Sequence, residues 1–85
     1  MNTRKGLAIL GSTGSIGTQA LDVVKSHQDK FQIEVLTAQN NADLLIEQAL
    51  EFRPNCVVIG KEVHYKKMLD RLDSEGIKVY TGRMR

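Results

Sequence analysis

The chain alternates short, mainly apolar runs with longer segments in which apolar residues recur every three or four positions. The mainly apolar runs span residues 7–10, 33–37, 56–59 and 77–80. Runs of this length predict four strands. The first run ends directly at Gly11, and a continuous apolar run bounded by glycine is typical of a strand buried on both faces of a parallel sheet.

The segments between these strands predict three helices, because their apolar residues repeat at helical spacing. The recurring positions of the first helix are Ile16, Ala20, Val23, Val24 and His27. Those of the second are Ala42, Leu45, Ile46, Ala49 and Leu50, and those of the third are Tyr65, Met68, Leu69 and Leu72. We expect Ser15 to cap the first helix and the polar turn 39–41 to cap the second. The polar segment 26–30, Pro54 and Gly76 are expected to end the three helices. The order β-α-β-α-β-α-β predicts an α/β, Rossmann-like parallel sheet with flanking helices.

This order is shorter than a complete dinucleotide-binding domain. Such a domain contains two mononucleotide-binding halves, whereas 85 residues hold one half and a little more. We therefore expect residues 1–85 to be a partial NADPH-binding domain from the N-terminal portion of a longer protein, with the catalytic and C-terminal domains absent from this chain. The hypothesis predicts exposed apolar surface where later elements would pack.

The segment GSTGSIG, between the first strand and the first helix, carries the candidate chemistry. Gly11, Gly14 and Gly17 follow a G-x-x-G-x-x-G pattern, not the commoner G-x-G-x-x-G. We expect Gly11 to permit a sharp turn, Gly14 to let the backbone approach a pyrophosphate, and Gly17 to allow close packing of the helix. Free N–H groups at the helix start, and the hydroxyls of Ser12, Thr13 and Ser15, would donate to phosphate oxygens. A tight turn without a ligand is the simpler alternative, and the lack of a Gly-Lys-Ser/Thr at the end of the loop argues against a Walker-type site.

The end of the second strand distinguishes NAD from NADP. An acidic residue there binds the ribose 2′-hydroxyl of NAD, and NADP sites avoid it. Residues 36–41 read LTAQNN, with no carboxylate to repel a 2′-phosphate and no lysine or arginine to bind it. We therefore expect NADP, held by neutral donors that are weaker than charge-assisted ones. Helix capping is the simpler explanation for Asn40 and Asn41, and we expect one of them to do only that.

Composition and charge argue against several other classes. A net charge of +2, with no tryptophan and no long basic run, argues against nucleic-acid binding. The N-terminal apolar run breaks at Gly11, so neither a signal peptide nor a membrane span is predicted. The single cysteine, Cys56, cannot form an internal disulfide, and its apolar neighbours predict a buried, inert thiol. Together these features predict a cytoplasmic protein.

Three segments, GSTGSIG, the following LDVV and the later EQALEFRP, closely resemble the N-terminus of 1-deoxy-D-xylulose 5-phosphate reductoisomerases, over a stretch from about Leu7 to Ile59. The resemblance implies an NADP-dependent oxidoreductase of non-mevalonate isoprenoid biosynthesis. Such an enzyme rearranges 1-deoxy-D-xylulose 5-phosphate and reduces the resulting aldehyde with NADPH, giving 2-C-methyl-D-erythritol 4-phosphate. The resemblance also implies a requirement for Mg²⁺ or Mn²⁺ and a homodimer for the full-length enzyme.

The family's NADPH contacts map onto two groups of residues in this chain. These are Thr13, Gly14, Ser15 and Ile16 in the loop, and Gln39, Asn40 and Asn41 in the later turn. Many members have Ala-Gly-Lys-Asn where this chain has Ala-Gln-Asn-Asn at 38–41, and the missing lysine weakens the expected preference for NADP. The family's metal and substrate-phosphate ligands lie in a later domain, beyond Arg85. The resemblance thus implies no catalytic or metal-binding residue here, and the 85-residue chain alone is predicted to be inactive.

The other titratable residues are expected at the surface. Asp70, Asp73 and Glu75 lie on a predicted helix and its end, where solvation explains them. His27 and His64 have no partner visible in the sequence.

Two alternatives stay open. One is a short-chain or aspartate-semialdehyde-type NADP-dependent reductase, since such enzymes have related glycine loops. A Tyr-x-x-x-Lys pair or a cysteine nucleophile downstream would favour it. The other is a non-catalytic nucleotide-binding module, which tight NADPH binding by the isolated chain would favour.

Overall fold

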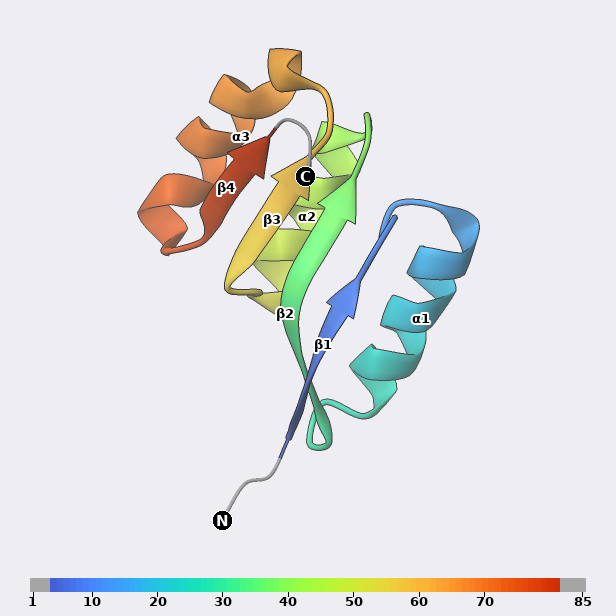
Figure 1. Ribbon diagram of the computed structural model, residues 1–85. Coiled ribbons are helices and arrows are strands. Elements are labelled where there is room, and N and C mark those ends of the chain that lie inside the picture. The colour runs from blue at the N-terminus through green and yellow to red at the C-terminus, as the bar shows by residue number, and fades with distance from the viewer. Residues whose placement is uncertain (1–3, 82–85) are drawn as a thin grey trace.

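The computed structural model describes residues 4–81, and residues 1–3 and 82–85 lie outside the described range. The elements are β1 (Lys5–Ile9), α1 (Ser15–Ser26), β2 (Phe31–Ala38), α2 (Ala42–Phe52), β3 (Cys56–Ile59), α3 (Tyr65–Leu72) and β4 (Lys78–Thr81). Single 3₁₀ turns, η1 (Glu62–His64) and η2 (Asp73–Glu75), flank α3. The predicted β-α-β-α-β-α-β order is confirmed (Figure 1).

The four strands form one parallel sheet in the order β1-β2-β3-β4. β3 has the predicted bounds, whereas β2 extends beyond 33–37 at both ends and β1 and β4 are shifted against the apolar runs. The differences arise because the ladder is made by the backbone, so that Lys5 and Thr81 join it although they are polar.

The hydrophobic core lies on one face of the sheet. Ile9, Leu36, Val57 and Val79 align in one row across the four strands, and the last three are buried. Each helix adds residues to the same cluster: Leu21 and Val24 from α1, Leu45 and Ile46 from α2, and Met68 and Leu72 from α3. In Figure 1, α2 passes behind β2 and β3, so the face turned to the viewer is the opposite one.

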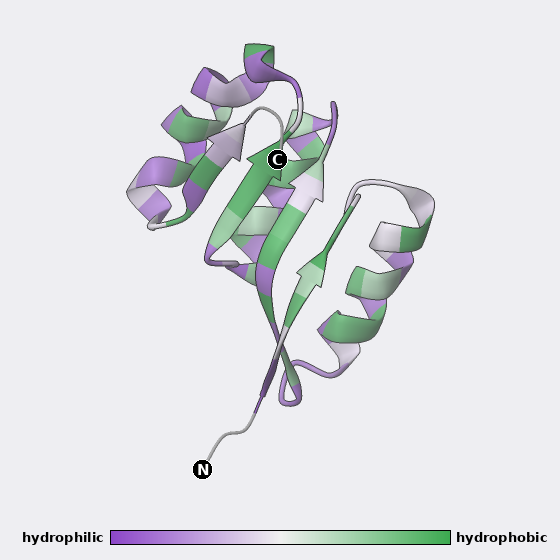
Figure 2. Cartoon of the chain, viewed as in Figure 1, coloured by the Kyte–Doolittle hydropathy of each residue, from purple (hydrophilic) through white to green (hydrophobic). Residues whose placement is uncertain are grey.

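Within residues 4–81, no helix packs on that opposite face. Its row of aligned residues, Ala8, Val35, Cys56 and Lys78, is half-buried or exposed. Figure 2 shows apolar residues along β1, β2 and β3, and the strand pleat turns every second one toward this side. The expected exposed apolar surface is therefore present. The prediction that the first strand is buried on both faces is wrong for the described residues, and Cys56 is half-buried for the same reason.

α1 turns a different face to the core than its apolar spacing predicts. Gly17, Leu21 and Val24 are buried, whereas Ile16 and Val23 are 82% and 57% exposed. The reason is the tight contact between Gly17 and the preceding loop, which fixes the rotation of the helix about its axis and directs Ile16 outward. The predicted face of α1 is therefore confirmed at Val24 and wrong at Ile16 and Val23, and the helix itself is confirmed.

α2 and α3 bury the predicted faces and end near the predicted residues. α2 ends at Phe52, followed by Arg53 in a left-handed conformation (φ 54°) and then Pro54. α3 continues into η2, and Gly76 (φ 77°) follows. In the described part of the chain, no helix has the length and apolar character needed to cross a membrane.

Candidate functional site

The segments that follow β1, β2 and β3 lie at one edge of the sheet, where the carboxyl ends of the strands meet (top of Figure 1). These segments are the glycine loop at residues 10–14, the turn at residues 39–41, and Gly60. In open parallel α/β sheets, ligands bind outside this edge. The topology therefore brings together the two groups of residues that the sequence predicted to bind a cofactor.

The glycine loop turns sharply between β1 and α1. Gly11 has a positive φ of 66°, a conformation that favours glycine, and its carbonyl accepts a hydrogen bond from the Gly14 N–H at 3.0 Å. Gly14 is the N-cap of α1. The prediction that Ser15 caps this helix is therefore wrong: Ser15 is the first helical residue, because the turn closed by Gly11 ends one position earlier.

Gly17 and Gly14 meet different surroundings. A Cβ on Gly17 would lie 2.2 Å from the Gly11 carbonyl oxygen and 2.7 Å from the Ser12 Cα, whereas a Cβ on Gly14 would meet only the Gly11 oxygen, at 3.5 Å. The expected close packing at Gly17 is confirmed, but its partner is the loop backbone and not the strand, as the motif had predicted. Gly14 has open space around it, which is the condition for close approach by a ligand.

Backbone donors are available at the start of α1. No protein atom within residues 4–81 accepts a hydrogen bond from the N–H of Ser15 or Ile16, and the first intrahelical bond runs from the Thr18 N–H to the Gly14 carbonyl. Thr13 is half-buried, and the next three residues are exposed. Open N–H groups and the helix dipole both favour a bound anion. The four loop residues predicted to contact the cofactor thus surround donors that are suited to phosphate.

Ser12 does not lie where its hydroxyl could reach a phosphate. It is fully buried, and its Oγ donates to Gln48 Oε1 at 2.7 Å. The expectation that Ser12 donates to phosphate is therefore wrong, because α2 supplies a buried acceptor. Gln48 is a buried partner of the glycine loop that sequence reasoning missed. The available signal was a glutamine three residues after Leu45, on the buried side of an otherwise apolar helix face.

The turn after β2 divides its three polar residues between two roles. Asn41 Oδ1 accepts from the Leu44 N–H at 3.2 Å and so caps α2, which confirms that one asparagine of the pair acts as a cap. Gln39 and Asn40 are exposed. The Gln39 amide lies against Gly60, because a Cβ there would come within 2.3 Å of its Oε1. Gln39 and Asn40 thus take no part in the side-chain cap of α2.

The charge beside this turn is balanced. Asp43, in the first turn of α2, lies 2.5 Å from the Lys67 Nζ of α3. The hydrogen bond from Lys67, followed by its charge, holds the pKa of Asp43 below its usual range. The nearest carboxylate in sequence is therefore paired with a cation, which lessens its repulsion of an anion at the turn.

Other titratable groups lie away from this edge or point to solvent. Asp70, Asp73 and Glu75 are exposed, and Glu75 pairs with Arg53 at 2.7 Å. His27 Nδ1 lies 2.9 Å from the Val23 carbonyl oxygen of its own helix. Among residues 4–81, no three histidine, cysteine or acidic side chains gather in a group that could hold a metal ion.

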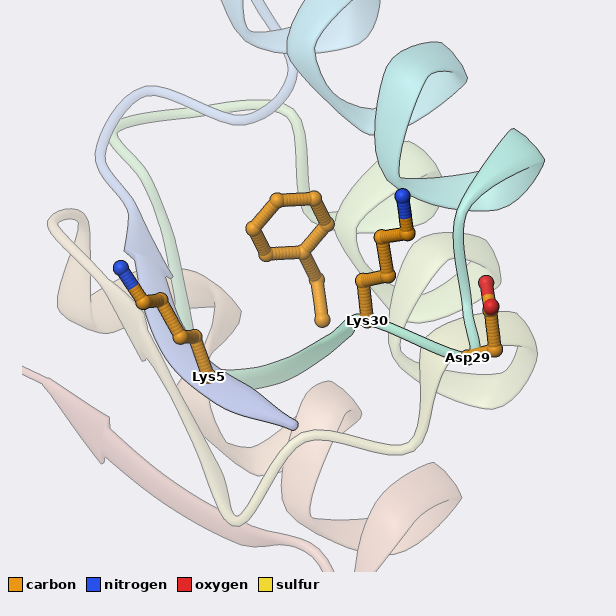
Figure 3. Close-up of a pocket in the computed structure, with 4 residues that line it drawn as sticks. Lys5, Asp29 and Lys30 are labelled. Atoms are coloured by element: carbon orange, nitrogen blue, oxygen red, sulfur yellow. The ribbon is translucent and has the colours of Figure 1, made fainter. Parts of the chain in front are cut away.

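A hollow at the other end of the sheet is lined by Lys5, Asp29, Lys30 and Phe31 (Figure 3). Lys5 extends from β1, and Asp29 and Lys30 extend from the turn before β2. This is the amino end of the strands, opposite the edge where parallel sheets bind ligands. The hollow therefore does not compete with the glycine loop as the candidate site.

Comparison with known proteins decides the family. The sequence profile for 1-deoxy-D-xylulose 5-phosphate reductoisomerase matches residues 7–84. The chain belongs to this family. The reductoisomerase of Phocaeicola vulgatus is 51% identical over 79 residues, which cover 93% of this chain and 21% of the relative. That of Clostridium perfringens is 46% identical over 74 residues, which cover 87% of this chain and 19% of the relative. The chain spans about a fifth of the length of these reductoisomerases.

Solved reductoisomerase structures have the same fold in this part. The enzyme from Zymomonas mobilis in complex with NADPH superposes with a TM-score of 0.90 at 28% identity, over 94% of this chain and 21% of that one. A reductoisomerase in complex with NADPH, fosmidomycin and magnesium superposes with a TM-score of 0.85 at 29% identity. The match covers 92% of this chain and 19% of that one. The Rossmann-like fold is thus confirmed, and membership of the reductoisomerase family separates the chain from short-chain and semialdehyde-type reductases.

Proposed function

We propose that this chain is the NADPH-binding N-terminal part of a 1-deoxy-D-xylulose 5-phosphate reductoisomerase. The observation that carries the proposal is the start of α1, where the N–H groups of Ser15 and Ile16 are open and Gly14 leaves space in front of them. A pyrophosphate fits such a cradle. The similar Zymomonas mobilis enzyme holds NADPH, which supports the same ligand for this chain.

The two groups of residues would hold different parts of NADPH. The loop residues Thr13, Gly14, Ser15 and Ile16 would bind the pyrophosphate, with hydroxyl donors beside the helix N-terminus. Gln39 and Asn40 would meet the 2′-phosphate of the ribose, while Asn41 contributes through its helix cap. NADPH, when bound, supplies the hydride, and the residues of this chain bind and orient it.

The reaction of the whole protein is part of the same proposal. It would rearrange 1-deoxy-D-xylulose 5-phosphate and reduce the product with NADPH to 2-C-methyl-D-erythritol 4-phosphate, as a homodimer in the cytoplasm. The similar complex that contains magnesium supports a requirement for Mg²⁺, and Mn²⁺ is expected to substitute for it. The metal and catalytic residues would lie in later domains, so the isolated 85-residue chain is predicted to be inactive.

Calorimetric titration of the natural, full-length protein with NADPH and NADH tests the proposal, followed by turnover with 1-deoxy-D-xylulose 5-phosphate. We expect tighter binding of NADPH than of NADH, and consumption of NADPH only when the sugar phosphate is present. Binding without turnover would instead favour a non-catalytic nucleotide-binding module. Absence of NADPH binding would contradict the proposal.

The preference for NADPH is predicted to depend on the turn after β2. A Gln39→Gly, Asn40→Lys double variant gains a cation beside the proposed 2′-phosphate, and charge-assisted hydrogen bonds are about twice as strong as neutral ones. We expect the variant to bind NADPH more tightly while its affinity for NADH stays nearly unchanged. An unchanged ratio of the two dissociation constants would contradict this assignment of the turn.

A further inference from the structure

A buried pair of hydrogen bonds joins the glycine loop to α2. Ser12 Oγ donates to Gln48 Oε1 at 2.7 Å, and Gln48 Nε2 donates to the Ser12 carbonyl oxygen at 2.8 Å. The oxygen and the nitrogen of the Gln48 amide thus both bond to Ser12, which lies 36 positions earlier in the chain. Since the amide nitrogen must donate and the oxygen must accept, the orientation of the Gln48 side chain is fixed by these bonds.

The pair is shielded from water. Ser12 is 0% exposed and Gln48 is 6% exposed, and they are the two buried polar residues among the described ones. When a buried polar group loses its partner, the free-energy cost exceeds that of the hydrogen bond alone, because water cannot replace the partner. The Ser12 main chain is therefore held in one place as long as Gln48 is present.

Ser12 lies at the centre of the turn that forms the site. Its N–H donates to the Thr37 carbonyl at 2.8 Å, and the tight contact of Gly17 includes its Cα. The loop is therefore fixed from β2 on one side and from α2 on the other. Removal of Gln48 would release the second attachment and leave the first in place.

We propose that Gln48 is a positioning residue of the dinucleotide site, an inference that rests on the proposed NADPH binding. Gln48 holds Ser12, and through Ser12 it holds the loop conformation in which the N–H groups of Ser15 and Ile16 face the pyrophosphate. It touches no part of the cofactor itself. A loop that samples other conformations binds its ligand more weakly, in proportion to the fraction of time spent in the competent one.

The test compares two ligands on the natural, full-length protein and on its Gln48→Met variant, which keeps the side-chain length without donor or acceptor. We expect the dissociation constant for NADPH to rise at least about tenfold, because the variant loses both buried hydrogen bonds and the loss of one alone is worth about that factor. Adenosine 2′-monophosphate, measured by competition, contains the ribose end without the pyrophosphate, so its dissociation constant should stay unchanged.

A matched control separates positioning from general loss of stability. Leu72→Ala removes a fully buried side chain from α3 and leaves the Ser12–Gln48 pair intact, so that it should lower stability without changing either dissociation constant below its unfolding temperature. An equal loss of affinity for both ligands in Gln48→Met would overturn the inference. An unchanged affinity for NADPH would overturn it as well.

A second variant covers the case in which Gln48→Met does not fold. Gln48→Glu keeps an acceptor for the Ser12 hydroxyl but places a carboxylate oxygen against the Ser12 carbonyl. We expect selective loss of NADPH affinity as the pH rises and the buried carboxyl ionises, and recovery as the pH falls and the protonated carboxyl again donates. NADPH binding by Gln48→Glu that stays tight up to the highest pH at which the protein is folded would overturn the inference. Failure of the unsubstituted protein to bind NADPH would overturn both the inference and the proposed function.

Discussion

Gly14 and Gly17 belong to one motif but stand under different constraints. A Cβ on Gly17 would lie 2.2 Å from a backbone oxygen that cannot move without distorting the turn, whereas a Cβ on Gly14 would be in ordinary contact at 3.5 Å. Gly17 is therefore needed by the fold, and Gly14 is available to the ligand.

This difference predicts opposite outcomes for two alanine substitutions. Gly17→Ala should lower the free energy of unfolding by about 1–3 kcal/mol, the usual cost of overpacking, as measured by denaturant titration. Gly14→Ala should leave the stability nearly unchanged and weaken NADPH binding, because the new methyl group would meet the pyrophosphate. Similar unfolding curves for both variants would contradict the division of roles.

At the scale of single residues, the sequence predicted local backbone features better than contacts between distant residues. The turn at Gly11 and the close packing at Gly17 follow from the motif alone, because they depend on neighbouring residues. The burial of Ser12 does not, because its hydroxyl is taken by a glutamine 36 positions away. Whether a loop serine faces a ligand or the interior depends on the tertiary partner that reaches it.

At the scale of elements, helix and strand positions followed from apolar spacing, but the rotation of α1 did not. Spacing favoured a face containing Ile16 and Val23, since both are large and apolar. The contact of Gly17 with the loop backbone decides otherwise, and Leu21, which the spacing did not select, faces the core together with Val24. The periodicity of apolar residues cannot reveal which face a backbone contact selects.

The ion pair between α2 and α3 gives a prediction about acid titration. The folded-state pKa of Asp43 is lowered, first by the hydrogen bond from Lys67 and then by its charge. The resulting stabilisation is therefore present above the unfolded-state pKa and is lost as the pH falls through the folded-state value. Carboxyl NMR should show Asp43 titrating below the usual aspartate range.

Two lysine variants test this assignment. Lys67→Met should raise the pKa of Asp43 toward its ordinary value, while Lys66→Met, at the adjacent position of α3, should leave it unchanged. Because both partners are largely exposed, the effect on overall stability should be small. An Asp43 titration that does not respond to Lys67→Met would contradict the pairing.

At the scale of the whole molecule, the sheet is covered on one side only within the described residues. The uncovered side includes half-buried Val35 and Val58, together with Tyr80, which is 50% exposed. Continuous apolar surface of this kind marks a place where other protein packs. The sequence predicted this surface from the count of β-α units, although it predicted neither its position nor the half-burial of Cys56.

The isolated 85-residue chain is therefore expected to bind an anilinonaphthalene sulfonate dye, which reports exposed apolar surface. A Val35→Thr, Val58→Thr double variant should bind less dye at unchanged helix content by circular dichroism, because both side chains lie on the uncovered side. A stable monomeric chain that binds no dye would contradict the exposed face.

The attachment of the glycine loop to β2 also sets the distance along the strand between that attachment and the polar turn. Thr37 accepts from the N–H of Gly11 through its Oγ1 and from the N–H of Ser12 through its carbonyl, and Gln39 follows two residues later. An extended strand advances about 3.3 Å per residue, so the point of β2 that holds the loop and the start of the polar turn are roughly 7 Å apart. In the proposed complex, this interval would have to match the separation of the pyrophosphate and the 2′-phosphate of NADPH. The sheet would then select ligands by the separation of their charges, before any side chain of the turn discriminates between NADP and NAD.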